Sequence, residues 1–310
     1  MELELIAWLR DRLPPHQAMI VGPGIDDAAV LRSDAWNGCV VTADLLTDGV
    51  DFELANIDPR RAGRKALAVN LSDMAAMAAQ PVAAVITLAL PRSGGVDLAK
   101  QFYEGLIPLA EKYDVALAGG DTNAWDAPLV ISVTLLGTPS AAGPLTRRGA
   151  QVGDAIVVTG KFGGSILGHH LDFEPRVAEA LELVANYPVH AGIDVSDGLS
   201  LDLSRVCAES GCGAVVETGA IPLAKAAGEI ALQRNDGSTA LSHALGDGED
   251  FELVLAMPQA AAQELVARQP LACGCTCIGQ FVADEGLWQV DSRGARVSLP
   301  VRGFEHRFDT

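Results

Sequence analysis

The amino-acid sequence predicts an α/β or α+β protein of two domains. Its 310 residues exceed what one ordinary hydrophobic core accommodates. In the first half, apolar segments typical of strands alternate with segments typical of helices. A stretch rich in Gly, Pro, Ser and Ala, residues 137–153, then precedes a second series of strands and helices. We therefore predict domains at residues 1–138 and 150–310, joined by a linker at residues 139–149.

Apolar runs and prolines predict the elements of the first half. Residues 59–79 are rich in Ala, with Pro59 at the start and Pro81 beyond the end, which is typical of a long helix. The apolar run 82–90, which stops at Pro91, is typical of a buried strand. The other predicted helices are residues 2–13 and 96–113. The other predicted strands are residues 40–42, 115–118 and 129–136.

The second half continues with the same kinds of segment. Its predicted strands are residues 155–159, 214–217 and 251–256. Its predicted helices are residues 176–186 and 198–210. We find no repeat of short period in the chain.

The net charge of −18 limits the possible partners. A chain this acidic repels nucleic-acid phosphates, so we expect no nucleic-acid partner. ATP is an anion too, but carboxylates can hold a divalent cation that in turn holds the phosphates. The alternative is that the acidity only aids solubility. Composition alone leaves both interpretations open.

The sequence favours a cytoplasmic protein without a membrane partner. No apolar run reaches the roughly 18 residues that span a bilayer. The first residues are acidic and lack the basic and then apolar plan of a signal peptide.

Six acidic segments carry the candidate chemistry, and we expect each in a turn at the end of an apolar segment. They are Gly24–Asp27, Thr42–Asp44, Asn70–Asp73, Gly119–Thr122, Asp194–Gly198 and Gly248–Asp250. Magnesium prefers hard oxygen ligands, and Gly lets the backbone approach a phosphate closely. Asp, Ser and Gly are also ordinary turn and cap residues, which is the alternative for any single segment. Six such segments in one chain favour a metal and phosphate site.

Familiar nucleotide and hydrolase motifs are absent from the sequence. It contains no GxxxxGK[ST], no GxSxG and no HExxH, and the segment Gly22–Gly24 does not complete GxGxxG. Arg147 and Arg148 stand in the Gly-rich stretch, where they could contact a transferring phosphate or simply face solvent.

These segments, in this order, resemble the thiamine-monophosphate kinase family of the aminoimidazole-ribonucleotide synthetase superfamily. The likeness covers nearly the whole chain. The matching stretches are GPGIDDAAV (22–30), TADLLTDGVDF (42–52), DPRRAGRKALAVNLSDMAAM (58–77), GGDT (119–122), LTRRGAQVGD (145–154), IDVSDGLSLDL (193–203), GDGEDFEL (246–253) and RGFEHRF (302–308).

The resemblance implies two α/β domains, with mixed sheets packed by helices, and a homodimer formed through the N-terminal domains. It also implies direct transfer of the γ-phosphoryl group of ATP to thiamine monophosphate, with several Mg²⁺ ions. The implied magnesium ligands are Asp27, Thr42, Asp44, Asp73, Asp121, Asp194 and Asp197. The implied ATP contacts are Tyr103, Gly120, Asp121, Arg147 and Ser196. The implied substrate contacts are Asp51, Glu249 and Phe304. Among all these, the implied catalytic residues are Asp73, Asp121, Arg147 and Asp197.

Three positions depart from the family pattern. Ile25 stands where Gly usually precedes the paired aspartates, and Ala43 stands where a hydroxyl residue is common. Asp51 takes the place of a usual His that faces the substrate. The last change could alter the choice of acceptor or only reshape the pocket.

Two other functions remain open at this stage. One is another ATP-dependent synthetase of the same superfamily. The other is an ATP-binding assembly protein without turnover of its own.

Overall fold

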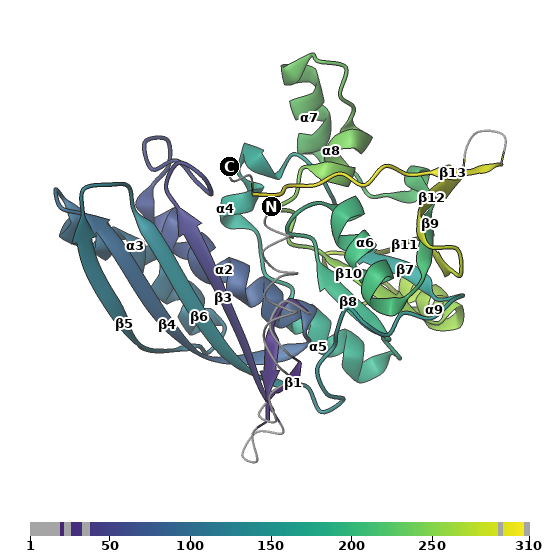
Figure 1. The fold of residues 1–310 in the computed structure, drawn as a ribbon, viewed down its shortest axis with the longest axis horizontal. Helices are drawn as coiled ribbons and strands as arrows, with labels where there is room; N and C mark the ends of the chain where they lie inside the picture. The colour runs from purple at the N-terminus through teal and green to yellow at the C-terminus, as the bar shows by residue number, and fades with distance from the viewer. Residues whose placement is uncertain (1–18, 22–25, 33–37, 291–293, 307–310) are drawn as a thin grey trace.

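The computed structural model describes residues 19–21, 26–32, 38–290 and 294–306. Two mixed sheets packed with helices make up the fold, which confirms the predicted class (Figure 1). The predicted helix at residues 2–13 and the departure at Ile25 lie outside the described residues.

The first sheet contains six strands in the order β1-β2-β3-β6-β4-β5. Neighbouring strands are antiparallel except β4 and β5, which run parallel. The strands are β1 Met19–Val21, β2 Ala29–Leu31, β3 Cys39–Thr47, β4 Ala79–Pro91, β5 Ala116–Trp125 and β6 Val130–Pro139.

Two long helices, α2 Pro59–Ala76 and α3 Gly95–Lys112, pack on this sheet. Asp58 caps α2 by accepting a 2.9 Å hydrogen bond from the amide of Arg60, and Pro59 occupies the first turn. Small Ala side chains allow most of α2 to be buried. The helix ends three residues before the predicted end, because Ala78 adopts a left-handed conformation (φ 46°) and β4 begins at Ala79.

The second sheet contains seven strands in the order β13-β12-β9-β11-β7-β10-β8. Only β12 and β9 pair in parallel among these described strands. The strands are β7 Ala155–Thr159, β8 Ala191–Asp194, β9 Gly213–Val216, β10 Leu253–Met257, β11 Cys275–Val282, β12 Gly286–Val290 and β13 Arg296–Ser298. The helices of this half are α4 His169–Asp172, α5 Val177–Asn186, α6 Leu199–Ser210, α7 Lys225–Arg234, α8 Ala240–Gly246 and α9 Gln259–Arg268, with 3₁₀ turns at Ser165–Leu167 and Thr218–Ala220.

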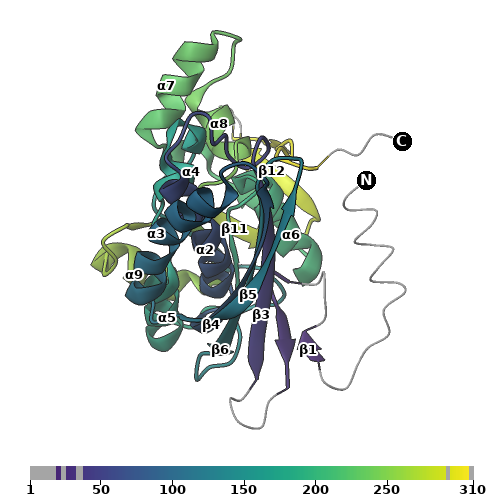
Figure 2. The same cartoon turned by 90° about the vertical axis from the view of Figure 1, so that its left-hand side faces the viewer.

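Helix α2 lies between the two sheets. It contacts β3, β4 and β6 of the first sheet and β8, α4 and α5 of the second half. Figure 2 shows α2 and α3 together on one side of the first sheet. Among the described residues, the helices with substantial contacts to this sheet are α2, α3 and α5.

Both faces of the second sheet are buried, so its central strands are continuously apolar. In β10, Leu253 and Leu255 belong to the core that also contains α2, whereas Val254 and Ala256 belong to a second core. Because successive side chains of β10 point to opposite faces of the sheet, one of its faces shares a core with α2. Strand β8, which pairs with β10, also contacts α2.

Three of the six acidic segments do not lie in turns, which corrects the expectation for them. Thr42–Asp44 lies inside β3, Asn70–Asp73 inside α2, and Gly119–Thr122 inside β5. Pairing with β4 extends β5 through its two glycines as far as Trp125, although Gly disfavours strands. Within the described residues, no helix is both long and apolar enough to cross a membrane.

Candidate active site

One face of α2 carries residues that reach two sites. Lys65, Val69, Ser72 and Asp73 are spaced i, i+4, i+7 and i+8, which places them on one side of a helix. With a rise of about 1.5 Å per residue, Lys65 and Asp73 lie about 12 Å apart along the axis. Lys65 and Val69 line a cavity. Asp73 belongs to a carboxylate cluster, and Ser72 donates a hydrogen bond to another member of it.

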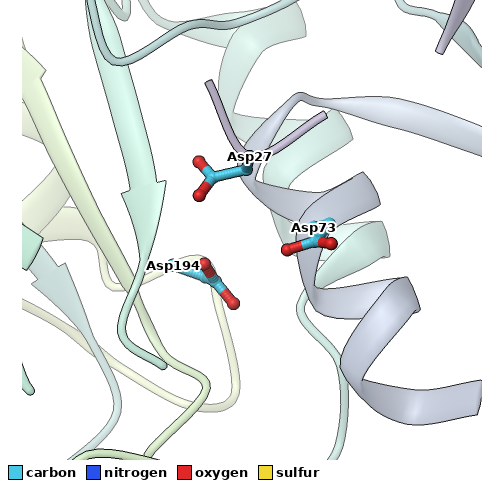
Figure 3. A group of neighbouring side chains, drawn as sticks. All are labelled: Asp27, Asp73 and Asp194. Carbon is cyan, nitrogen blue, oxygen red and sulfur yellow. The ribbon is translucent and has the colours of Figure 1, made fainter. Parts of the chain in front are cut away.

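The carboxylate cluster contains Asp27, Asp73 and Asp194. One oxygen from each lies within 4.8 Å of the others. Figure 3 shows the three side chains projecting from separate segments toward a shared space. Asp27 precedes β2, Asp73 is on α2 and Asp194 ends β8, so both domains contribute.

Hydroxyl and guanidinium groups hold these carboxylates in place. Thr42 on β3 donates to Asp73, and Ser72 donates a 2.5 Å hydrogen bond to Asp194. The guanidinium of Arg147 forms an ion pair with Asp27. The Arg147 amide donates a 2.9 Å hydrogen bond to Asp26. Arg147, which the sequence placed in a loop that could face solvent, is therefore directed at the cluster.

Several buried oxygens of the cluster and of the neighbouring Asp44 lack a hydrogen-bond partner within the described structure. They are Oδ2 of Asp27, Oδ2 of Asp44 and Oδ1 of Asp194. Buried polar atoms are rarely left unpaired, so each needs an explanation. Bound cations would satisfy such oxygens, because carboxylate oxygens are their natural ligands.

The electrostatics of the cluster also point to a cation. Burial, reinforced by neighbouring carboxylates, raises the pKa of Asp73 and of Asp194 well above the ordinary value. The same causes raise the pKa of Asp44 to about 7 and that of Asp26 to about 7. Without a cation, the site therefore retains protons near neutral pH. A divalent ion would take their place.

A cavity of about 480 Å³ opens next to the cluster. We call it the acceptor pocket, because the substrate contacts that the family resemblance implies, Asp51, Glu249 and Phe304, line it. Its lining includes six residues predicted from the sequence: Asp44, Asp51, Ser196, Asp197, Glu249 and Phe304. Leu46, Val69 and Phe251 add apolar surface. The pocket thus combines carboxylates with apolar and aromatic walls.

Lys65 is a pocket residue that the sequence reasoning missed. Its ammonium forms a 2.5 Å ion pair with Glu249 and donates a 2.7 Å hydrogen bond to the carbonyl oxygen of Asp51. Burial raises the pKa of Glu249, and the Lys65 charge opposes that rise. Ser72 was also missed as a partner of Asp194. The helical spacing of positions 65, 69, 72 and 73 is the signal that could have identified both residues.

Asp51 has a local structural role. Its carboxylate accepts a 2.6 Å hydrogen bond from the amide of Thr47 and so closes the turn after β3. Its side chain still lines the acceptor pocket. The departure from His at this position therefore adds a negative charge to the pocket and stabilises the turn.

The segment after β8 joins the pocket to the irregular segment that follows β13. Asp197 pairs with Arg205 at 2.6 Å, and its carbonyl oxygen accepts a 2.9 Å hydrogen bond from the amide of Phe304. Asp202 accepts 3.0 Å hydrogen bonds from the amides of Asp197 and Gly198 and fixes this turn at the start of α6. The ring of Phe304 is half-exposed at the pocket. It is thus available to stack on a ligand.

Three predicted residues lie elsewhere. Gly120 and Asp121 are on β5, where all residues are exposed, and Tyr103 on α3 lines a separate groove beside β5. The strand register aligns Asp121 with Leu45 of β3 across β4 and β6. Three strand spacings, about 14 Å, therefore separate Asp121 from the position next to Asp44. One chain does not bring Asp121 to the cluster.

Comparison with protein families gives two matches. Residues 25–138 match the N-terminal domain of AIR synthase related proteins, and residues 151–287 match their C-terminal domain. The thiamine-monophosphate kinase of Rhodopirellula baltica is 42% identical over 317 aligned residues, which cover 99% of this chain and 97% of the relative.

Solved structures give the same result. AaThiL complexed with AMPPCP and TMP is similar with a TM-score of 0.79 and 26% identity, covering 99% of this chain and 97% of that one. The thiamine-monophosphate kinase of Stenotrophomonas maltophilia is similar with a TM-score of 0.71 and 34% identity, covering 94% and 96%.

Proposed function

The chain belongs to the AIR synthase related proteins and, among them, to the thiamine-monophosphate kinases, and we propose that it uses magnesium to transfer a phosphoryl group from ATP to thiamine monophosphate. The products are ADP and thiamine diphosphate. One observation carries this proposal: the carboxylate cluster and the acceptor pocket lie side by side along one face of α2. The distance of about 12 Å from Lys65 to Asp73 suits an elongated acceptor whose phosphate reaches the cluster.

The residues of the cluster suit magnesium. Asp27, Asp44, Asp73 and Asp194 would hold the ions, because they offer hard oxygen ligands. Three of them have an oxygen with no hydrogen-bond partner among the described residues. Thr42 and Asp197 stand beside this set as further oxygen donors. Bound magnesium supplies charge neutralisation, which lets two anionic phosphates approach each other.

The chain's own residues position the reacting groups. Arg147, fixed by Asp27 and Asp26, presents a guanidinium suited to a phosphate of ATP. Ser196 and Asp197 line the pocket between the cluster and Glu249. No general base is required, because an ionised phosphate oxygen of the acceptor is already a nucleophile. Catalysis then depends on in-line positioning and on charge.

The acceptor pocket suits the ring end of thiamine monophosphate. Phe304 offers an exposed ring for stacking. Glu249 offers a carboxylate that can accept hydrogen bonds from an amino group. Asp51 adds a negative charge near the cationic thiazolium ring. The use of ATP supports a cytoplasmic location.

A homodimer would complete the site. Gly120, Asp121 and Tyr103 lie on the β5 side of the first sheet, away from the cluster of their own chain. The sheet face opposite α2 exposes apolar side chains, including Leu45 and Val85. Exposed apolar surface of this kind favours association. We propose that two copies pair through this face and that Asp121 of one copy serves the cluster of the other.

The test is direct assay of the purified protein with ATP, Mg²⁺ and thiamine monophosphate. We expect thiamine diphosphate and ADP in equal amounts, and none when EDTA replaces Mg²⁺. ATP binding without any product would contradict the kinase and favour an ATP-binding assembly protein. ADP formation without thiamine diphosphate would favour another acceptor.

A further inference from the structure

Lys65 is a buried charged residue that has no role in the proposed phosphoryl transfer. Only 1% of its side chain is exposed. The side chain lies at the boundary between the two domains, with a partner in each. Burying an ammonium costs several kcal/mol unless it is well paired. A lysine at such a position needs an explanation beyond helix propensity.

The contacts of Lys65 join two walls of the acceptor pocket. Its ammonium bonds to the carbonyl oxygen of Asp51 in the N-terminal domain at 2.7 Å. The same ammonium bonds to Glu249 in the C-terminal domain at 2.5 Å. All three residues line the pocket. A single side chain of α2 therefore joins pocket walls from both domains.

Glu249 needs such a support. Its backbone adopts a left-handed conformation (φ 54°), and Phe251 two residues later does the same (φ 51°). Non-Gly residues rarely adopt this region, and it persists where surrounding contacts enforce it. Hydrogen bonds from the Glu249 amide to Ser196 (2.7 Å) and from the Phe251 amide to Val195 (2.8 Å) hold the backbone. Lys65 holds the Glu249 side chain.

An ammonium also has three donors, and the described residues accept hydrogen bonds from two of them.

The position of Lys65 along α2 differs from that of the cluster-facing residues on the same helix face. Ser72 and Asp73 serve the end of the site where phosphate transfer would occur. Lys65, two turns earlier, serves the end that recognises the acceptor.

We infer that Lys65 is a positioning residue for the acceptor: it holds Glu249 and the Asp51 turn in one pocket wall, so that thiamine monophosphate binding depends on it and ATP binding does not. This inference rests on the proposed function of the pocket. It adds that Lys65 positions the acceptor, whereas Ser72 and Asp73, farther along α2, act where the phosphate is transferred.

The experiment compares Lys65→Met with the wild type and with Lys100→Met. Lys100 is an exposed lysine of α3 in a surface pair with Asp97. We expect Lys65→Met to raise the KM for thiamine monophosphate about 10- to 100-fold, the range for losing a hydrogen bond to a charged group. The KM for ATP should stay within about twofold, and Lys100→Met should change neither KM.

A second variant covers the case in which Lys65→Met does not fold. Lys65→Gln keeps a hydrogen-bond donor without the charge, and it should show the same selective rise in the KM for the acceptor. Circular dichroism and thermal unfolding verify that each variant is folded. A folded variant with an unchanged acceptor KM, or with equal changes in both KM values, would overturn the inference. If the wild type itself forms no thiamine diphosphate, the proposed function fails instead.

Discussion

Ser72 on α2 donates a 2.5 Å hydrogen bond to Asp194 at the end of β8, so a helix of one domain directly orients a carboxylate of the other. Both side chains are buried, and the second oxygen of Asp194 has no hydrogen-bond partner among the described residues. The bond therefore turns one oxygen toward α2 and leaves the other for a ligand. The relative placement of the two domains is thus part of the site itself.

Ser72→Ala should weaken magnesium binding. Groups that orient a metal ligand typically contribute about 10- to 100-fold to metal affinity. We expect the magnesium concentration for half-maximal turnover to rise by about that factor, with the fold retained. Ser204→Ala is the matched control, since its hydroxyl donates to the carbonyl oxygen of Leu201 within α6. If both variants behave alike, the Ser72–Asp194 bond has no role in metal binding.

Asp73→Asn should abolish most turnover without unfolding the protein. Loss of a direct ligand should exceed the effect of an orienting group, so we expect a decrease of about 100-fold or more. The variant should be about as stable as the wild type in EDTA, because the raised pKa of Asp73 already favours its neutral form when no cation is bound. Turnover and Tm in EDTA measure the two effects. Persistent activity with a lowered Tm would indicate that Asp73 only pairs with Thr42.

Local signals in the sequence predicted the elements that depend on local structure. Helix α2 was predicted to within three residues because its Ala content and flanking prolines act within the segment itself. Strand β5 was predicted too short, because its extension through Gly119 and Gly120 depends on pairing with β4, which lies about 30 residues earlier.

The residues of the acceptor pocket also show that contacts between distant parts of the chain are hard to predict from sequence. Glu249 and Phe304 were predicted from motifs, and the structure places both at one cavity. Lys65 was not recognised, because its burial depends on a partner 184 residues away. A lysine in a helix ordinarily faces solvent, so only the folded arrangement reveals this one as buried.

Stability without metal should depend on pH. The raised pKa of Asp44 and of Asp26, each about 7, means that the folded protein binds protons that the unfolded chain releases near pH 4. A raised pKa of a carboxyl contributes stability that is complete below the unfolded value and is lost as pH rises through the folded value. We therefore expect Tm in EDTA to fall between pH 5.5 and pH 8.

Magnesium should oppose this fall, because the ion replaces the protons of the cluster. The increase in Tm on adding Mg²⁺ should be larger at pH 8 than at pH 5.5. Part of the slope should remain, because burial also raises the pKa of Asp202 and of Asp250 to about 7 outside the cluster. A magnesium effect on Tm that is independent of pH would contradict the titration of the cluster.

Asp51→Asn tests whether the charge at this departure recognises the acceptor. The amide oxygen can still accept the hydrogen bond from Thr47, so the turn should persist. Without the negative charge near the thiazolium ring, the KM for thiamine monophosphate should rise a few-fold, about the effect of one partly screened charge. The KM for ATP should not change. Asp51→His, which restores the usual family residue, then measures how much of the change is specific to Asp.

Complementation between two inactive chains tests whether Asp121 acts on the partner's site. Asp73→Asn and Asp121→Asn should each be inactive as a homodimer. In a mixed dimer, the cluster of the Asp121→Asn chain retains its own Asp73 and receives the intact Asp121 of the Asp73→Asn chain. One of its two sites is then complete, whereas the other carries both defects.

Co-expression in equal amounts should make about half of the dimers mixed, each with one intact site of two, and so restore about a quarter of wild-type turnover. If Asp121 instead acted within its own chain, every site in the mixed dimer would carry one defect and no activity would return. The separation of about 14 Å between Asp121 and the β3 position beside Asp44 favours the first result. The restored activity should purify with dimers that carry both of two different affinity tags, because only these contain an intact site.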